Sequence, residues 1–423
     1  MKVKGMKQTK IMLVLCILGY AQNLYSITAF NLIRPFDPNF FPAFHKDRKI
    51  QCALIAGFGD SKVHGRNMDG TPANVLQRYY AQQDGLAMLK GFPINSQQAQ
   101  LGQQININDD QNERGHFVVT GKLKVPFSGS LWGRLNFKHG IWIGAGLPII
   151  AVHMKDVQWV DQTQNITLDD ALTHELITDN FAAHVAELGD GLQIGDWKKA
   201  GVGDLALYGG WRQQYLQEKN WIKEAVINAR IAVLFPTGVK KNQDIAVSFE
   251  FGNDGAFALP LGAGLDLRFK KFFWAGLDVM FMKIFSHTKE RRIQTDPAQT
   301  DLLLLQKAVT RRQYGITQYF NLYLEPIIYK GLSMRFAYEC IKHMDDRIYT
   351  ISNDFSSLTS NMSLTLEEWT THDVFIQAKY DGDHDKKEHR RVTTEGMLFA
   401  KIPFNGKASY QVSLIGFSFT VNF

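Results

Sequence analysis

The sequence predicts an all-β protein, a transmembrane antiparallel β-barrel of about 12 strands with 14 as the second choice, because single-chain barrels have even strand numbers. Two observations predict this fold. After residue 26, no run of about 18 apolar residues occurs, which is the length that marks a membrane-spanning helix. Instead, segments of about ten residues with alternating apolar and polar side chains recur along the chain, and the final one ends on Phe423.

The composition fits a barrel wall and gives no support for a nucleic-acid partner. Hydrophobic residues make up 45% of the chain and aromatic residues 12%, yet the mean hydropathy is slightly negative. A large soluble all-β or α/β protein has a similar composition, so composition alone does not decide. Four of the 47 Lys and Arg residues lie at positions 2, 4, 7 and 10, which leaves 43 positive against 41 negative residues elsewhere. Nucleic-acid binding needs a clustered basic surface, which this balance does not predict.

The first 26 residues have the features of a signal peptide. A Lys-rich start precedes the apolar stretch from Ile11 to Gly19, about half the length that a membrane anchor needs. Cleavage after Ala21 fits the small-residue rule, and cleavage after Ser26 is the alternative. Only Cys52 and Cys340 follow this leader, too few for a disulfide scaffold, and both are expected to be unpaired wall residues.

Residues 413–423 alternate strictly between two faces, as a strand requires. The apolar face carries Ile415, Phe417, Phe419, Val421 and Phe423. A last strand of this kind resembles the assembly signal of bacterial outer-membrane proteins, with Phe419, Val421 and Phe423 as its residues here. The resemblance implies insertion by the barrel-assembly machinery and location in the cell outer membrane, with lipid against the apolar face.

The same two-residue period recurs upstream. It covers residues 117–125, 131–137, 227–235, 263–269, 275–281, 320–325, 332–339 and 374–379. With Gln51–Gly59 included, thirteen strands are counted, so one assignment is wrong or one strand is missed.

The spacing between these segments predicts a barrel with two different rims. Turns of about two residues fall at 139–140, 270–271 and 330–331, whereas residues 155–201, 287–315 and 345–370 form long insertions. Short turns belong on the periplasmic side and long loops on the outer side. Aromatic residues near the turns predict an interfacial girdle, made of Trp142, Phe272, Phe273, Trp274 and Tyr329.

Three segments lie outside the predicted wall. Residues 72–91 look helical, and a helix there serves either as a plug inside the barrel or as a surface loop. Residues 30–44, which hold three prolines and five phenylalanines, are expected to pack into the lumen or at the periplasmic mouth. A second helix is predicted within 155–201, packed on the rim or lining an entry site for a hydrophobic solute, from Leu168, Leu172, Leu176, Ile177, Phe181, Val185 and Leu188 at helical spacing.

The predicted organisation has three parts. Residues 1–26 are the signal peptide. Residues 27–114 form an N-terminal segment with a first strand and the helical plug or loop. Residues 115–423 form the outer-membrane β-barrel.

One region resembles known transporters. The stretch from Gly201 to Tyr215 includes Gly203-Asp204-Leu205, and the strand that begins at Ala229 closes with Pro236-Thr237-Gly238. Over residues 201–238 the chain resembles outer-membrane transporters associated with aromatic-compound degradation and, more distantly, the long-chain fatty-acid transporter family. The resemblance implies uptake of small, often hydrophobic molecules. The N-terminal hatch of the fatty-acid transporters has no clear match here, so lateral release is not implied.

The predicted function is an outer-membrane channel or transporter for passive uptake of small, hydrophobic or aromatic solutes. Inward charges would hydrate the lumen and set its field, and the candidates are Arg134, Arg212, Arg230, Asp266, Arg268, Asp278, Glu325, Arg335 and Glu339. The alternatives are a general diffusion porin and a structural barrel without an open pore, in which the same charges pair and fill the interior.

No sequence pattern supports a catalytic site, a metal site or a cofactor. His174-Glu175 lacks the second His of metalloproteases, residues 115–123 lack the Ser or Thr of a phosphate loop, and no G-x-S-x-G occurs. Residues 384–389, HDKKEH, predict a solvated turn rather than a metal site. A barrel hydrolase is the least favoured alternative, and no pattern defines an oligomeric state.

Overall fold

The computed structural model describes residues 30–34, 37–41, 48–60, 63–105, 114–163, 173, 179–218, 221–270, 272–382 and 392–423. The predicted signal peptide, the 384–389 turn and most of the predicted helix stripe from Leu168 to Ile177 lie outside the described residues.

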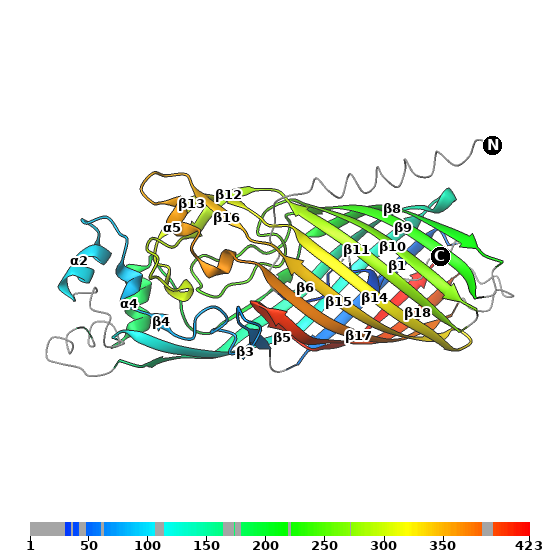
Figure 1. The fold of residues 1–423 in the computed structure, drawn as a ribbon, viewed down its shortest axis with the longest axis horizontal. Coiled ribbons are helices and arrows are strands. Elements are labelled where there is room, and N and C mark those ends of the chain that lie inside the picture. The colour runs from blue at the N-terminus through cyan, green and yellow to red at the C-terminus, as the bar shows by residue number, and fades with distance from the viewer. Residues whose placement is uncertain are drawn as a thin grey trace.

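Twelve strands among the described residues form a closed antiparallel barrel (Figure 1), which confirms the predicted fold class and strand number. Each strand pairs with the next barrel strand in the chain, and β1 lies between β5 and β20, which closes the ring. The strands of the barrel are β1 (Ile50–Gly59), β5 (His116–Asn136), β6 (Ile141–Asp161), β8 (Leu205–Leu216), β9 (Ile222–Phe235), β10 (Ala258–Phe269), β11 (Phe273–Ile284), β14 (Thr317–Tyr329), β15 (Leu332–His343), β17 (Trp369–Asp381), β18 (Thr393–Lys407) and β20 (Leu414–Asn422).

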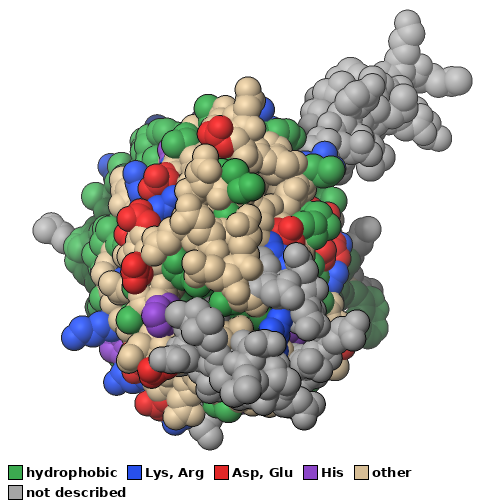
Figure 2. Space-filling view, turned by 90° about the vertical axis from the view of Figure 1, so that its left-hand side faces the viewer, with side chains coloured by type: hydrophobic (Ala, Val, Ile, Leu, Met, Phe, Trp, Pro, Cys, Tyr) green, Lys and Arg blue, Asp and Glu red, His purple; other side chains and the backbone are tan. Residues whose placement is uncertain are grey.

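The two rims of the barrel differ. At the rim where the wall begins and ends, short turns join β5 to β6, β8 to β9, β10 to β11 and β14 to β15, and the amide of Phe423 donates to the carbonyl of Ile50 at 2.8 Å. Long loops gather at the opposite rim (Figure 1), namely the described parts of residues 60–115, 162–204, 236–257, 285–316, 344–368 and 408–413. These two ends are called the turn rim and the loop rim below. Figure 2 faces the loop rim and shows side chains of both charge signs across that surface.

Small elements outside the barrel wall occupy the loops, apart from η1 and η3. The strands are β2 (His64–Arg66), β3 (Pro72–Ala73), β4 (Gln83–Asp84), β7 (Trp197–Val202), β12 (His287–Arg292), β13 (Lys307–Gln313), β16 (Arg347–Thr350) and β19 (Ser409–Gln411). The helices and 3-10 turns are α2 (Gln97–Gln104), α4 (Phe181–Leu188), α5 (Ser357–Ser360), η1 (Pro38–Phe40), η2 (Ala87–Leu89), η3 (Lys138–Gly140), η4 (Asp301–Leu303) and η5 (Leu364–Leu366). In the part of the chain that is described, none of the helices has the length and apolarity needed to cross a bilayer.

The outer surface of the wall is apolar at membrane depth. Leu265, Leu322 and Ile415 are 41%, 50% and 70% exposed, respectively, although each is a large hydrophobic residue. Exposure of such an apolar surface is unfavourable in water but not in lipid. The exterior is therefore that of an outer-membrane barrel. Cys52 and Cys340 are unpaired residues of this wall, as predicted.

A charge on this outer face should destabilise the barrel according to its depth. Leu265 lies near the middle of β10, whereas Leu267 lies two residues from the strand end at the turn rim. We expect Leu265→Arg to lower the free energy of unfolding by about 2 to 4 kcal/mol and Leu267→Arg by less, because the cost falls toward the interfaces. Urea unfolding in lipid vesicles measures both. Equal costs at the two positions would contradict the depth assigned to this strand.

Exposed aromatic side chains surround the turn rim, but two of the five predicted girdle residues are not among them. Trp142 is 5% exposed and faces the interior, where it contacts the Phe41 ring. Trp274 lies on the inner face beside the guanidinium of Arg268. Both residues have even numbers, and the odd-numbered residues beside them face lipid. Because successive side chains of a strand point to opposite faces, Trp142 and Trp274 point inward although they lie near a turn. The exposed aromatics near this rim are Phe137, Trp211, Tyr215, Trp221, Phe272, Phe273, Tyr329, Tyr380 and Phe423.

Strand β5 corrects both the count of thirteen and one of the predicted faces. Residues 117–125 and 131–137, read as separate patterns, lie almost entirely on this single strand of 21 residues. Its register shifts between Lys124 and Phe127, and the inward positions change from odd to even there. Phe117 and Val119 are therefore buried inside an extension of the wall beyond the membrane. Outside the bilayer, water lies on the outer face, so the apolar residues turn inward.

The helix predicted for residues 72–91 is wrong. The segment forms β3, turns, β4 and η2 at the loop rim. The side chain of Asn74 accepts a hydrogen bond from the amide of Leu76, and that of Asp84 accepts from Leu86 and Ala87. Such local side-chain bonds to the backbone compete with helix formation. Leu76 lies against the inner face of the β5 and β6 extension, so this segment covers the loop rim.

The predicted second helix is present in part as α4. Phe181, Val185 and Leu188 form its buried face. The ring of Phe181 stacks on Phe117 with centroids 4.2 Å apart and lies 5.4 Å from Trp159. Helix α4 thus packs inside the extended wall of β5 and β6.

Candidate functional site

The nine charged candidates for the lumen all lie on the inner face of the barrel, and most contact a partner on another strand. The pairs are Arg230 with Asp278, Arg212 with Asp266, Arg335 with Glu325, Arg268 with Glu224, Glu339 with Lys401, and Arg134 with Gln51. Opposite charges therefore meet across the interior instead of standing alone.

The pair of Arg230 and Asp278 shows how the sequence makes room for such contacts. The guanidinium binds the carboxylate through two bonds, Nη1 to Oδ2 at 2.6 Å and Nη2 to Oδ1 at 2.5 Å. The pair crosses β10 above Gly262 and Gly264. A Cβ at Gly262 would lie 2.9 Å from Cζ of Arg230, and one at Gly264 would lie 2.7 Å from Oδ2 of Asp278. The glycines on the inner face of β10 thus provide the space for a bidentate ion pair.

A second network links four strands nearer the turn rim. The hydroxyl of Tyr323 donates to Oδ1 of Asp266 at 2.7 Å, and Nη2 of Arg212 lies 3.6 Å from Oδ2 of the same carboxylate. The guanidinium of Arg335 lies 4.0 Å from the Tyr323 ring centroid and 2.6 Å from Oε2 of Glu325. These contacts join β8, β10, β14 and β15 across the lumen wall.

Residues 30–34 and 37–41, called the lumen segment below, run inside the barrel. At the loop-rim end, Phe30 stacks on Tyr410 with centroids 5.3 Å apart. At the other end, Phe40 packs edge-on against Phe375 and Phe399 at 5.2 and 4.9 Å, and Phe41 contacts Trp132, Trp142 and Tyr208. The lumen is therefore occupied by a segment that precedes the first wall strand.

Buried charges hold this segment at its centre. Nζ of Lys401 lies 2.5 Å from Oε1 of Glu339 and 3.8 Å from Oδ2 of Asp37, which belongs to the lumen segment. The hydroxyl of Tyr319 lies 2.9 Å from Oδ1 of Asp37 and 2.9 Å from Oε2 of Glu339. Nδ2 of Asn31 donates to Oδ1 of Asp373 at 2.7 Å. Lys401 and Glu339 are fully buried. We call Asp37, Glu339, Asp373 and Lys401 the lumen charge cluster.

Sequence reasoning found only Glu339 of this cluster as a site candidate. Asp373 lies just before the predicted segment 374–379 and is not among the site candidates. Lys401 lies on β18, which has apolar residues on both faces and therefore shows no alternation to mark it. Asp37 lies in the proline-rich segment before the wall, whose position in the lumen was one of two expectations. The local signal for Asp37 is its position directly before Pro38, which favours an N-cap. In the structure, the Asp37 side chain accepts a hydrogen bond from the amide of Asn39 at the start of the turn Pro38–Phe40.

A cavity of about 170 Å³, called the outer cavity below, lies among the loops at the loop rim. Its walls combine apolar and aromatic side chains with several cations, and they include Leu76, Arg78, Tyr79, Lys241, Val247, Phe249, Arg291, Trp369 and Tyr410. Phe249 and Tyr410 also contact Phe30, with ring centroids 5.4 and 5.3 Å away. The outer cavity thus adjoins the start of the lumen segment.

The motif that resembles transporters anchors one wall of this cavity. Asp204 accepts hydrogen bonds from the amide of Gly238 at 2.9 Å and of Asn253 at 2.6 Å, which ties together both ends of loop 236–257. The hydroxyl of Thr237 accepts from the amide of Leu205 at 2.9 Å. Burial raises the pKa of the Asp204 carboxyl to about 6. These residues therefore shape the loop that carries Lys241 and Phe249.

The described residues contain no group of three or more His, Cys, Asp and Glu side chains placed to hold a metal ion.

A closed barrel of twelve strands, apolar outside and charged inside, has the fold of an outer-membrane channel. The solved structure of the COG4313 outer membrane channel from Pseudomonas putida F1 is similar to it, with a TM-score of 0.50 and 12% sequence identity over 92% of this chain and 99% of that chain. At this identity, the similarity is one of fold.

Two further solved structures belong to the kinds of transporter that the sequence resembles. The TodX deltaS2S3 mutant monoaromatic hydrocarbon channel has 10% identity and a TM-score of 0.34, over 92% of this chain and 93% of that chain. A Pseudomonas aeruginosa FadL homologue has 9% identity and a TM-score of 0.28, over 95% and 99%. TM-scores this low carry no argument about function. No family model and no curated protein matches the sequence.

Proposed function

We propose that this protein is an outer-membrane channel for passive uptake of small, hydrophobic or aromatic solutes, and that the lumen segment closes it at rest. One observation carries the proposal: residues 30–34 and 37–41 fill the interior without belonging to the wall. Barrels of about eight strands are filled by wall side chains, and the diameter grows with strand number. A ring of twelve strands has space for a separate segment, which noncovalent contacts alone hold in place.

Two features support a hydrophobic or aromatic solute. The outer cavity has aromatic and aliphatic walls, and it adjoins the lumen segment through Phe249 and Tyr410. The resemblance over residues 201–238 points to the same class of solute. The nine inner charges would hydrate the lumen once the segment has moved.

The proposal includes the route to the membrane. Cleavage of residues 1–21 or 1–26 would leave the lumen segment near the mature N-terminus, free of the leader. The strand that ends on Phe419, Val421 and Phe423 would be recognised by the barrel-assembly machinery.

Ion preference in a planar bilayer tests the channel. We expect purified protein to give a current whose preference shifts toward cations when Arg230 and Arg268 are both changed to Gln, because two inner positive charges are lost. The matched control is Arg230→Gln with Asp278→Asn, which leaves the net charge unchanged and should leave the preference unchanged. Arg311→Gln, on the exposed surface of β13, controls for charge outside the lumen.

A barrel that carries no current in any variant, although it is folded, would favour the structural alternative, in which the same pairs only rigidify the interior. A large current with no solute preference in uptake tests would favour the general diffusion porin.

A further inference from the structure

The outer cavity is lined by more cations than acids, and three of its cations have no described carboxylate oxygen within ion-pair distance. Its lining includes five cationic residues, Arg78, Lys241, Arg291, Arg292 and Arg312, and three acidic ones, Glu250, Asp254 and Asp301. Arg312 is paired with Asp346, and Arg292 with Asp244. For Arg78, Lys241 and Arg291, no described carboxylate oxygen lies within the ion-pair distance of 4.0 Å.

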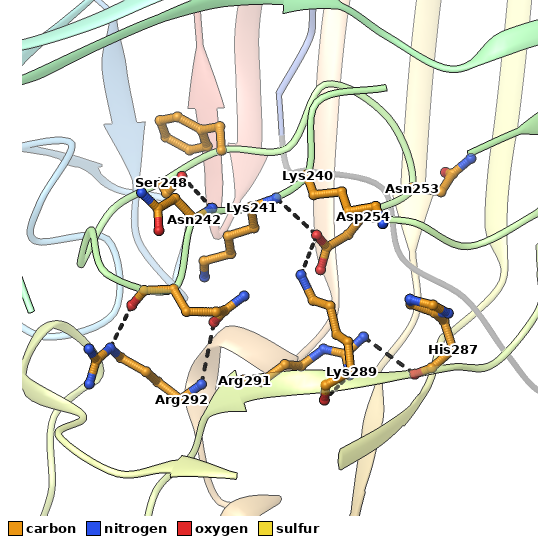
Figure 3. Close-up of polar contacts among 12 residues, drawn as sticks. Lys240, Lys241, Asn242, Ser248, Asn253, Asp254, His287, Lys289, Arg291 and Arg292 are labelled. Carbon is orange, nitrogen blue, oxygen red and sulfur yellow. Dashed lines mark hydrogen bonds and ion pairs between the residues drawn. The ribbon is translucent and has the colours of Figure 1, made fainter. Parts of the chain in front are cut away.

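Lys241 is the clearest of these cations. Its backbone amide donates to Oδ1 of Asp254 at 2.9 Å, and Figure 3 draws no hydrogen bond or ion pair to its ammonium. The Asp254 carboxylate is paired with Nζ of Lys289 at 2.5 Å and acts on the Lys241 ammonium only from beyond ion-pair distance. Burial lowers the pKa of the Lys241 ammonium, and the carboxylates of Glu250, Asp254 and Asp301 partly oppose this shift. A bound anion would oppose it further.

Two arginines extend the cationic wall. The guanidinium of Arg78 stacks on the rings of Tyr79 and Tyr410, 4.3 and 4.0 Å from their centroids, and its Nε is buried without a hydrogen-bond partner. Arg291 is 4% exposed, its Nε also lacks a partner, and its Nη atoms bond only to neutral oxygens such as the carbonyl of Thr310. A buried cation without a counter-ion is costly, and a bound carboxylate would relieve that cost.

The size and walls of the cavity define the rest of the ligand. A cavity of about 150 Å³ holds one benzene molecule in an engineered apolar core, and the outer cavity measures about 170 Å³. Val247, Phe249 and Trp369 supply apolar surface. One aromatic ring with a small anionic substituent fits both the volume and the chemistry.

We propose that the outer cavity binds a monocyclic aromatic carboxylate, with its carboxylate on the Lys241 ammonium, supported by Arg78, and its ring against the apolar wall. This inference names the solute class of the proposed channel, and its physiological meaning rests on that proposed function. A carboxylate bound there lies beside Tyr410, whose ring contacts Arg78 on one side and Phe30 of the lumen segment on another.

Binding of sodium benzoate to the full-length protein in detergent, measured by calorimetry, tests the site. We expect saturable binding with one site, weaker by about tenfold or more in Lys241→Gln, because a hydrogen-bonded charge pair is lost. Lys240→Gln is the matched control, since Lys240 is exposed and does not line the cavity. Its affinity should change by less than about twofold, as for surface substitutions elsewhere. Heat-dependent migration on a gel verifies that each variant is folded.

Two other ligands test the assigned chemistry. Benzamide, the neutral analogue, should bind about tenfold more weakly than benzoate, because it lacks the anion that Lys241 attracts. A two-ring carboxylate, 2-naphthoate, should also bind more weakly, because an engineered cavity of similar size holds a single benzene ring.

The proposal is overturned if benzoate does not bind, if benzamide binds equally well, or if Lys241→Gln and Lys240→Gln bind benzoate equally. These results are separate from the bilayer currents. If the protein conducts but does not bind benzoate, only the inference about this site is wrong. If it binds benzoate but never conducts, the binding site is supported and the proposed channel function is wrong.

Discussion

A barrel that lacks residues 30–41 is expected to conduct continuously, with a single-channel current several times that of the full-length protein. The lumen segment supplies Phe40 and Phe41 to the aromatic contacts of the interior and Asp37 to the lumen charge cluster. None of these residues belongs to the wall, so the twelve strands and their hydrogen bonds remain when they are removed. Water would then fill the space that the segment leaves. Planar-bilayer recordings of the deletion variant and the full chain measure the difference.

A point substitution distinguishes the removal of a plug from damage to the barrel. Phe40→Ala removes the ring that packs on Phe375 and Phe399 but keeps the segment and its charges. It should give intermittent openings between the two extremes, because loss of a buried aromatic ring costs about 3 to 5 kcal/mol. Exposed Phe137→Ala at the turn rim is the control and should behave as the full chain does. If the deletion variant folds and conducts no more than the full chain, the lumen segment does not close the channel.

The wall could be predicted from the sequence because its physics is local. The alternation of neighbouring residues is enough to place Leu265 and Leu277 on the lipid face, whichever strands they pair with. Strands β10 and β11 are found where this pattern occurs. The errors arise where the solvent changes. On β5, the apolar residues Phe117 and Val119 face inward because that part of the strand lies in water, and no local pattern shows where the bilayer ends.

The interior could be predicted only in part. Parity alone identifies Arg230 and Asp278 as inward residues, but their pairing depends on the order of strands β9, β10 and β11. The contact of Lys401 with Asp37 could not be predicted, because the two residues lie far apart in the sequence. In addition, the segment around Asp37 has no periodic pattern that would show which way its side chains point. The outer cavity could not be predicted at all, since residues of six separate loops line it. The resemblance over residues 201–238 includes Asp204, whose carboxylate anchors the loop that carries part of the cavity wall.

Replacing Lys401 with Met is expected to lower the free energy of unfolding by about 3 to 5 kcal/mol, because it removes one partner of a fully buried ion pair. The change removes the cation paired with Glu339 and Asp37 and leaves Arg34 as the cation that still acts on Glu339, Asp37 and Asp373. Their mutual repulsion acts on the lumen segment through Asp37. The same variant should therefore open more often in a planar bilayer, whereas a purely structural pair would alter stability alone.

Two further variants separate the charge from the loss of a side chain. Lys401→Met combined with Glu339→Gln removes one cation and one anion, so it should recover part of the stability and restore closure. Lys379→Met breaks the pair with Glu395, 3.1 Å apart on the inner face. Lys379 makes no ion pair with the described residues of the lumen segment, so this change should leave the current unchanged. A current from Lys401→Met equal to that of the full chain, in a folded barrel, would show that the charge cluster does not hold the segment. In that event, the aromatic contacts of Phe40 and Phe41 alone would account for closure.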